Sequence, residues 1–296
     1  MSIHIGRIFQ RKSVLTWVIL LITSCLIVVS CGKAPEATNS SASASSPVAG
    51  DVKSEITVAT EDDYPPFDFL MAGKHVGYNQ ELLDLVAKEK SLKIKQEVLP
   101  FQGILAGIAS NKYMATNSAV GITAKRAEVV DFTMPTTELT NFFLKRKGDT
   151  SIKGLKDFAG KTIAVQQGGI TAAVLESSVK PELAKTGAKV GDVKQYGAFA
   201  EAYQDLLNKR VDLVFNNIIA LKRLVSEKPD LYEIGEQIGP KVYAAWAVKK
   251  GNKETLDALN DGLARVKASG EMKKLQEKWL KISFGDLPNK PVIPST

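Results

Sequence analysis

Cysteine and histidine are scarce in this chain of 296 residues, which contains two of each. Both cysteines, Cys25 and Cys31, lie near the N-terminus, so the chain after them forms no intrachain disulfide and its core must supply the stability. His4 and His75 are far apart, and no Ser-His-Asp or metal-ligand arrangement is indicated. We therefore expect no catalytic residue, no metal site and no cofactor.

Long apolar runs are confined to Val14–Val29, a stretch of 16 residues without a charge. Arg7, Arg11 and Lys12 precede it, as in the n-region and h-region of a secretory signal. The run is shorter than the roughly 20 residues of a membrane span. We therefore expect a cleaved signal, and a retained membrane anchor is the alternative.

Small residues precede a cysteine at Val28–Cys31, which fits the lipobox of bacterial lipoproteins, where that cysteine is lipidated and becomes the first residue. Cys25 also fits locally, but cleavage there would leave Leu26–Val29 apolar, so Cys31 is preferred. Residues 31–53 are rich in Ser and Ala and predict a flexible tether. The sequence thus predicts a signal peptide at 1–30, a tether at 31–53, and a protein in the periplasm or at the cell surface, anchored to the membrane by lipid.

Charge of one sign does not dominate the chain, which has 39 Lys and Arg against 32 Asp and Glu. Three basic residues belong to the signal, which leaves 36 minus 32, or +4, spread along the chain. This mild excess gives no case for a nucleic-acid partner. The length is sufficient for two ordinary domains.

Apolar periodicity predicts alternating strands and helices in the first part of the globular body. The predicted strands are Ile56–Thr60, Lys93–Leu99 and Tyr113–Val120, and the helices between them are Asn79–Lys90 and Phe101–Ser110. This order implies a parallel sheet covered by helices, with ligands at the carboxyl ends of its strands.

The alternation starts again in the second part. Further strands are predicted at Asn141–Lys145, Lys161–Gln166, Lys194–Tyr196, Val211–Phe215 and Val242–Val248, and further helices at Ile170–Ser178, Phe199–Asn208, Ile218–Ser226, Leu256–Lys267 and Met272–Trp279. The fold class is therefore α/β.

Two stretches at carboxyl ends of predicted strands suggest a binding site. Glu61–Phe69 combines acids and aromatics on a loop that two prolines stiffen, and aromatics there could form a pocket wall or plug the core. In Ser118–Phe132, Thr123 is a good N-cap, and Arg126 offers a planar fork of donors to a carboxylate. The alternative is a plain strand–helix junction in which Arg126 pairs with an acid such as Asp131.

Seven motifs in order give the stretch from Ile56 to Leu280 a resemblance to the bacterial family 3 extracellular solute-binding proteins. They are YPPF with an acid following, Gly-Tyr-Asn before the first helix, FQGIL, GITAKRAEVVDFT, GKTIAVQQG, RVDLVFNN and a closing Lys-Trp helix. These proteins are the polar amino-acid receptors of ATP-driven importers. The resemblance implies a type II periplasmic-binding-protein fold with two lobes, residues 54–144 plus 249–296 and residues 145–248. The lobes would close as a hinge about Thr140–Lys147 and Tyr243–Lys250.

By the same resemblance, Arg126 grips the α-carboxylate of the ligand, Tyr64 and Phe101 sandwich the ligand, and Ala119 offers its carbonyl. Three positions depart from the family pattern. They are Gly121 in place of Ser or Thr, Gly169-Ile170 in place of Ser/Thr-Thr, and Asn217 in place of an Asp that holds the ammonium.

Asn217 is neutral, so a ligand ammonium would need another partner. Glu61 is the best candidate, and otherwise the ligand lacks a free α-ammonium. The ligand is expected to be a small polar solute, an amino acid or a derivative, and its identity stays open.

The resemblance implies a monomeric receptor that delivers its ligand to the permease of an ABC transporter. The alternatives are a binding module that serves a sensor partner and a periplasmic dehydratase-like enzyme on the same fold.

Replacing Cys31 by alanine tests the predicted anchor. Without the thiol no lipid can be attached, so the Cys31→Ala protein should move from the membrane fraction to the soluble fraction on immunoblots. A variant that stays in the membrane fraction as the wild type does would point to Cys25 or to a retained span.

Overall fold

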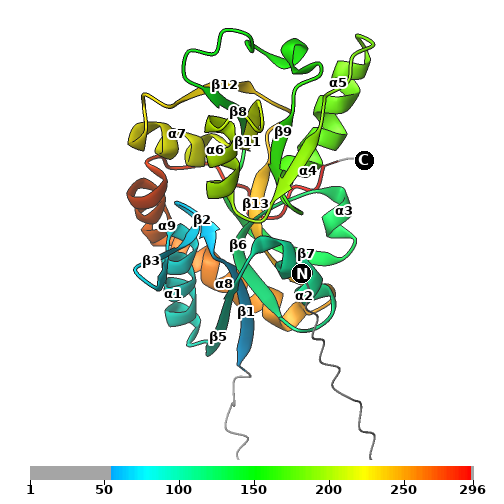
Figure 1. The fold of residues 1–296 in the computed structure, drawn as a ribbon. Coiled ribbons are helices and arrows are strands. Elements are labelled where there is room, and N and C mark those ends of the chain that lie inside the picture. The colour runs from blue at the N-terminus through cyan, green and yellow to red at the C-terminus, as the bar shows by residue number, and fades with distance from the viewer. Residues whose placement is uncertain (1–54, 295–296) are drawn as a thin grey trace, which may run out of the picture. The chain divides into compact units, whose positions relative to one another are not determined.

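The computed structural model describes residues 55–294, so the predicted signal peptide, the tether and Cys31 lie outside the described residues. The described part contains two sheets of five strands and a small sheet of three (Figure 1). None of its helices is long and apolar enough to cross a membrane. The two large sheets define the two lobes that the sequence predicts.

The first lobe is built on the sheet β5-β1-β6-β13-β7. Its strands are β1 (Ile56–Glu61), β5 (Ile94–Leu99), β6 (Ala115–Gly121), β7 (Val130–Glu138) and β13 (Tyr243–Lys249). β1 is parallel to β5 and β6, whereas β13 is antiparallel to β6 and β7. Its helices are η1 (Phe101–Gly103), α1 (Tyr78–Lys90), α2 (Ile104–Ala109), α3 (Ala124–Ala127), α8 (Lys253–Ala268), α9 (Glu271–Leu275) and η4 (Gln276–Leu280).

The second lobe is built on the sheet β10-β9-β11-β8-β12. Its strands are β8 (Asn141–Arg146), β9 (Ile163–Gln166), β10 (Val193–Tyr196), β11 (Leu213–Asn217) and β12 (Tyr232–Gln237). β9 is parallel to β10 and β11, and β8 is antiparallel to β11 and β12. Its helices are η2 (Leu155–Phe158), α4 (Ile170–Val174), η3 (Leu175–Val179), α5 (Lys180–Ala184), α6 (Phe199–Leu207) and α7 (Ile218–Glu227).

The chain passes between the lobes twice, and the strand after each crossover belongs wholly to the lobe that the chain enters. β8 lies wholly in the second sheet and β13 wholly in the first (Figure 1). The chain therefore crosses to the second lobe between β7 and β8 and returns between β12 and β13. Both crossovers lie a few residues before the boundaries at 144 and 248 that the resemblance implies. They lie there because Phe143 already pairs with Phe215 in the second sheet and Ala244 already pairs with Gly121 in the first.

A small antiparallel sheet covers the site end of the first lobe. It consists of β2 (Asp63–Tyr64), β3 (Asp68–Met71) and β4 (Lys74–Val76). The sequence predicted this stretch as an irregular loop, because its prolines oppose regular strands. Phe67 in the turn is fully buried, so this aromatic plugs the core rather than lining a pocket.

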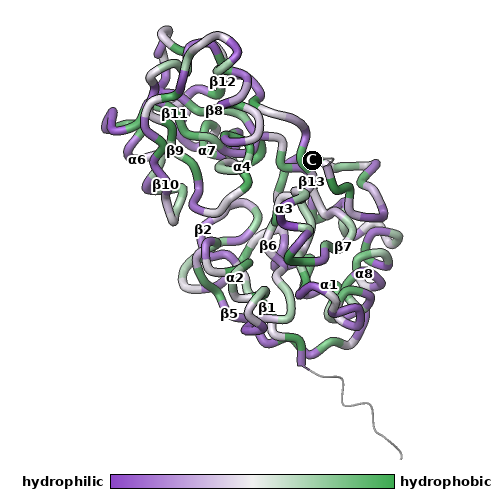
Figure 2. The backbone as a smooth tube through the Cα atoms, turned by 90° about the vertical axis from the view of Figure 1, so that its right-hand side faces the viewer, coloured by the Kyte–Doolittle hydropathy of each residue, from purple (hydrophilic) through white to green (hydrophobic). Residues whose placement is uncertain are grey.

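Buried apolar residues concentrate on central strands such as β9, β11 and β13, and green segments run through the interior of each lobe in the tube view (Figure 2). Trp246 at the middle of β13 is 0% exposed and belongs to the largest apolar cluster. Burial of a large aromatic side chain is worth about 1.5–3 kcal/mol relative to its exposure. The strand that returns from the second lobe thus anchors the first.

A Gly262→Ala variant tests the close packing of α8 on α1. A Cβ at Gly262 would lie 2.6 Å from Cγ1 of Val86. Such overpacking costs about 1–3 kcal/mol, whereas Ala inside a helix otherwise stabilises by about 1 kcal/mol. Denaturant unfolding should show a net loss of stability. Gly197→Ala, where no atom lies within 4 Å of the new Cβ, is the control, and equal stability of the two variants would contradict the packing.

Candidate ligand site between the two sheets

The site forms where strand ends of the two sheets face each other. Glu61 ends β1 and Gly121 ends β6 in the first sheet, while Gln166 ends β9 and Asn217 ends β11 in the second. All four strands are parallel members of their sheets, and ligands bind outside such carboxyl ends. The residues that the motifs singled out therefore come together across the two lobes.

Glu61 is a buried carboxyl group at this junction, with 2% of the residue exposed. Its Oε1 accepts a hydrogen bond from Nε2 of Gln166 in the other lobe, and its backbone N–H donates to Oγ of Ser118 at 2.8 Å. Its Oε2 is buried and has no hydrogen-bond partner. Burial, followed by the nearby charge of Asp68, raises the pKa of Glu61 well above its ordinary value, and the bond from Gln166 offsets part of this rise.

Asp68 is a second buried carboxyl group beside Glu61, and it is 0% exposed. Its Oδ2 accepts from Nδ2 of Asn79 at 2.6 Å, but its Oδ1 has no hydrogen-bond partner and lies 3.9 Å from Nε2 of His75. Burial raises the pKa of Asp68 well above its ordinary value, and the hydrogen bond from Asn79 offsets part of this rise. In residues 55–294 no three ligating side chains are grouped to hold a metal ion.

Arg126 lies in the first turn of α3, and Thr123 caps this helix as predicted, since its Oγ1 accepts from the Arg126 N–H at 3.2 Å. Nη1 of Arg126 donates to the Gly121 carbonyl at 2.7 Å, and Nη2 donates across the lobes to the Gly168 carbonyl at 2.8 Å. Burial lowers the pKa of Arg126 to about 10.

The alternative pairing of Arg126 with Asp131 is wrong. Asp131 instead pairs with Lys250 at 2.9 Å, and no carboxylate within the described range forms an ion pair with Arg126. The Arg126 guanidinium lies over the Phe101 ring, with Cζ 5.7 Å from the centroid.

Ile170 and Gly121 pack directly against each other across the lobes. A Cβ built on Gly121 would lie 2.7 Å from Cγ1, 2.9 Å from Cβ and 3.0 Å from Cδ1 of Ile170. Cβ atoms essentially never come closer than 3.0 Å to non-bonded heavy atoms, so any larger residue at position 121 would have to displace Ile170. The two departures from the family pattern therefore form one matched contact.

Tyr64 binds the second lobe through its hydroxyl group. Nδ2 of Asn217 donates to the Tyr64 hydroxyl at 2.5 Å, and that hydroxyl donates to Oδ1 of Asn216 at 3.2 Å. The Tyr64 ring stacks on Phe199 of α6 with centroids 5.3 Å apart. Oδ1 of Asn217 is occupied elsewhere, because it caps α7 by accepting from the N–H groups of residues 219 and 220 at 2.9 and 3.0 Å.

The remaining predicted residues take these places. Phe101 belongs to an apolar cluster separate from that of Tyr64, and its ring lies beneath the Arg126 guanidinium. Ala119 is buried in β6, and its N–H faces Asp68. Gly169 is the N-cap of α4 and offers no side chain. The roles in ligand binding that the resemblance gives to these residues stay predictions.

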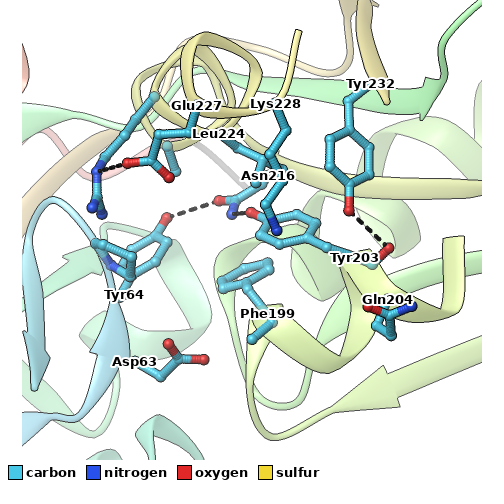
Figure 3. A pocket seen from close by; sticks show the side chains of 14 residues that line it. Asp63, Tyr64, Phe199, Tyr203, Gln204, Asn216, Leu224, Glu227, Lys228 and Tyr232 are labelled. Carbon is cyan, nitrogen blue, oxygen red and sulfur yellow. Dashed lines mark hydrogen bonds and ion pairs between the residues drawn. The ribbon is translucent and has the colours of Figure 1, made fainter. Parts of the chain in front are cut away.

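A pocket of about 200 Å³ opens beside Tyr64, between β2 and the helices α6 and α7. Figure 3 shows the rings of Tyr64, Phe199 and Tyr203 standing along it, with Asn216 bonded to Tyr64 and to Tyr203. Asp63 lies at its edge, near the start of α6. Burial raises the pKa of Asp63, and the N–H groups of residues 200 and 199 offset part of this rise.

Four contributors were not among the predicted site residues: Gln166, Asn216, Phe199 and Asp68, although Asp68 is the acid that follows the YPPF motif. Gln166 ends a predicted strand and Asn216 adjoins the candidate Asn217, so their position at carboxyl ends was an available signal. Phe199 begins a predicted helix, but only the closed arrangement of the lobes brings its ring onto Tyr64.

The geometry agrees with the comparison to known proteins. Residues 56–282 match the model of the bacterial extracellular solute-binding proteins, family 3. The chain belongs to this family, and its role is to bind a solute.

Individual relatives cover most of the chain. The arginine-binding extracellular protein ArtP of Bacillus subtilis is 25% identical over 267 residues, 89% of this chain and 97% of ArtP. The L-cystine-binding protein TcyJ of Escherichia coli K12 is 28% identical over 226 residues, 76% of this chain and 82% of TcyJ. Among solved structures, an ancestral arginine-binding protein bound to arginine has a TM-score of 0.68 and 32% identity, over 76% of this chain and 97% of that one. The two-lobe fold is thereby confirmed.

An Arg126→Ala variant tests the cross-lobe contact at Gly168. Without the guanidinium the two carbonyls lose their donor, so the lobes should spend more time apart. Small-angle X-ray scattering of the ligand-free protein should give a larger radius of gyration. Lys125→Ala, at the exposed neighbouring position, is the control, and an unchanged radius in Arg126→Ala would contradict a clamping role.

Proposed function

We propose that this protein captures a small cationic solute, a basic amino acid or a derivative of one, and delivers it to the permease of an ABC importer. Cys31 carries the lipid that holds the receptor at the membrane, on the outer side of the cytoplasmic membrane. The protein acts as a monomer, and no catalytic step belongs to its role. Family membership supports the binding role, and the solutes named for its relatives include arginine and cystine.

The buried Glu61 carboxyl group carries the proposal for a cation. A buried carboxylate with one unpartnered oxygen is costly, since an unsatisfied buried polar group costs about 1–3 kcal/mol and more when charged. An ammonium or guanidinium group supplies both the missing hydrogen bond and the opposite charge. Asn217 cannot do the same for a cation, because its Oδ1 already caps α7. The cationic group of the ligand therefore belongs at Glu61.

Ionisable groups around Glu61 make binding depend on pH. The groups that face it or its loop are Asp62, Asp63, Tyr64, Asp68 and His75. The pKa of Glu61 is raised in the ligand-free site by burial and by the charge of Asp68, so the carboxylate form that pairs with a cation is reached at a higher pH than for an ordinary glutamate. Affinity for a cation should therefore increase as the pH rises through this raised pKa, and binding should release protons.

A Glu61→Gln variant tests the proposal. The amide keeps an acceptor for Gln166 but removes the uncompensated charge, so ligand-free stability at pH 7 should rise by about 1–3 kcal/mol. The folded-state pKa of a buried acid is raised, so its contribution is favourable at low pH and is lost as the pH rises. The gain in Glu61→Gln should therefore shrink toward low pH.

Binding is measured by thermal shift and calorimetry with L-arginine, L-lysine, agmatine and putrescine. A ligand at 100 times its Kd adds about 2.7 kcal/mol to stability. Wild type and the control Asp62→Asn should bind at least one of these cations, and Glu61→Gln should lose that binding. Binding of glutamate in preference to every cation, or no response to any cation, would contradict the proposal.

A further inference from the structure

Asn141 is a buried asparagine whose side-chain amide is not used within the protein. It is 0% exposed, and neither its Nδ2 nor its Oδ1 has a hydrogen-bond partner in the described residues 55–294. Its backbone carbonyl, by contrast, accepts from the Ile238 N–H at 2.9 Å. A buried polar group without a partner is unfavourable, and in a native structure it calls for an explanation.

The amide lies at the edge of the second sheet that faces the first lobe. Asn141 is the first residue of β8, and β8 runs antiparallel to β11, so Asn141 lies directly opposite Asn217 at the end of β11. Side chains of directly opposite residues stand on the same face of a sheet, with Cβ atoms about 4.5–5.5 Å apart. The neighbouring amide of Asn217 donates across the lobes to Tyr64. The Asn141 amide therefore stands beside a contact between the lobes, in the region of the candidate site.

Glu61 lies two strands away along the same edge. Its Oε1 accepts from Gln166 at the end of β9, and the order of strands in this part of the second sheet is β9-β11-β8. Neighbouring strands lie about 4.8 Å apart, so the ends of β9 and β8 are roughly 10 Å apart. Oε2 of Glu61 and the Asn141 amide are both without a partner. A solute with an extended chain of a few carbon atoms can reach both groups.

The two groups need different partners. An ionised carboxylate such as that of Glu61 only accepts hydrogen bonds, whereas the Asn141 amide donates through Nδ2 and accepts through Oδ1. A hydroxyl group or a carboxamide can satisfy both atoms of Asn141, and an ammonium can satisfy only Oδ1. Asn217 does not serve these atoms, because its amide donates to Tyr64 and its Oδ1 caps α7. The solute itself must supply the partner.

We propose that Asn141 is a ligand-binding residue that contacts the end of the solute opposite its cationic group, so the site selects cations that carry a second, neutral polar group such as a hydroxyl or a carboxamide. Nδ2 of Asn141 donates to the oxygen of that group, and Oδ1 accepts from its O–H or N–H. This inference rests on the proposed function, since the cation binds at Glu61. The alternative is a structural amide that a buried water molecule satisfies, and such an amide would not discriminate between solutes.

Calorimetry on the full-length protein compares 4-guanidinobutan-1-ol with butylguanidine, which has the same guanidinium and carbon chain but ends in a methyl group. The wild type should bind the alcohol at least tenfold more tightly, because a site built to hydrogen-bond a hydroxyl rejects the analogue that lacks it. Equal affinity for the two, or tighter binding of butylguanidine, overturns this inference while the proposed function stands. No binding of these two, of agmatine or of L-arginine would overturn the proposed function, and this inference with it.

Variants of Asn141 test whether this residue causes the preference. Asn141→Leu keeps a side chain of similar length but removes both hydrogen-bonding atoms, so the preference for the alcohol should fall by tenfold or more. Asn141→Ala should give the same loss, and it serves where leucine does not fit. Asn208→Ala, at an exposed asparagine that ends α6, is the control and should keep the wild-type preference. An unchanged preference in an Asn141 variant with a wild-type melting temperature would show that the amide is structural and would overturn its role in binding.

Discussion

The buried carboxyl group of Glu61 is the constraint on which the rest of the site depends. It ends a strand of the first sheet, is bonded to Gln166, which ends a strand of the second, and is 2% exposed. Gln166 satisfies one of its oxygens, and the other has no partner. Since a desolvated carboxylate without a counter-charge is unfavourable, the closed ligand-free form keeps the pKa of Glu61 high. A cation would relieve this cost, which ties lobe closure to ligand charge.

The other cross-lobe contacts set the geometry around this group. Arg126 clamps Gly168 on one side, and Tyr64 bonds to Asn217 and stacks on Phe199 on the other. The neutral hydrogen bonds and the ring stack are each worth about 0.5–1.5 kcal/mol, and the bond from the charged Arg126 about 1.5–3 kcal/mol. A handful of such contacts holds two lobes together weakly enough for a ligand to exchange with them. Opening and closing of lobes about crossover strands is the hinge motion expected of such folds.

Much of the fold followed from sequence pattern, because buried strands and amphipathic helices leave strong periodic signals. The strands at Ile56–Glu61 and Ala115–Gly121 and the cap at Thr123 are examples, with boundaries within a few residues of those expected. β7 was missed because polar residues and Pro135 interrupt its apolar pattern, and its ladder is irregular at that proline.

Sequence pattern located the site but not its contacts. Glu61, Arg126 and Asn217 were predicted at or just after the ends of strands, and the structure brings these strand ends together across the two lobes. Sequence pattern could not show that the Gly168 carbonyl would accept from Arg126 or that Ile170 would pack against Gly121. Both contacts depend on the distance between the two lobes, and a periodicity within one segment holds no information on that distance. The cap of α7 by Asn217 is a local contact of a residue type that favours N-caps, and it was missed because Asn217 was assigned to the ligand.

Pairing of the ligand cation with Glu61 can be followed directly through the pKa of the Glu61 carboxyl group, measured by ¹³C NMR in a pH titration of labelled protein, with Glu61→Gln to assign the resonance. In the ligand-free protein this pKa should lie well above the usual value for a glutamate, and it should fall when agmatine or L-arginine saturates the site. A pKa near the ordinary value in the free protein, or one that does not fall with either cation bound, would contradict the pairing.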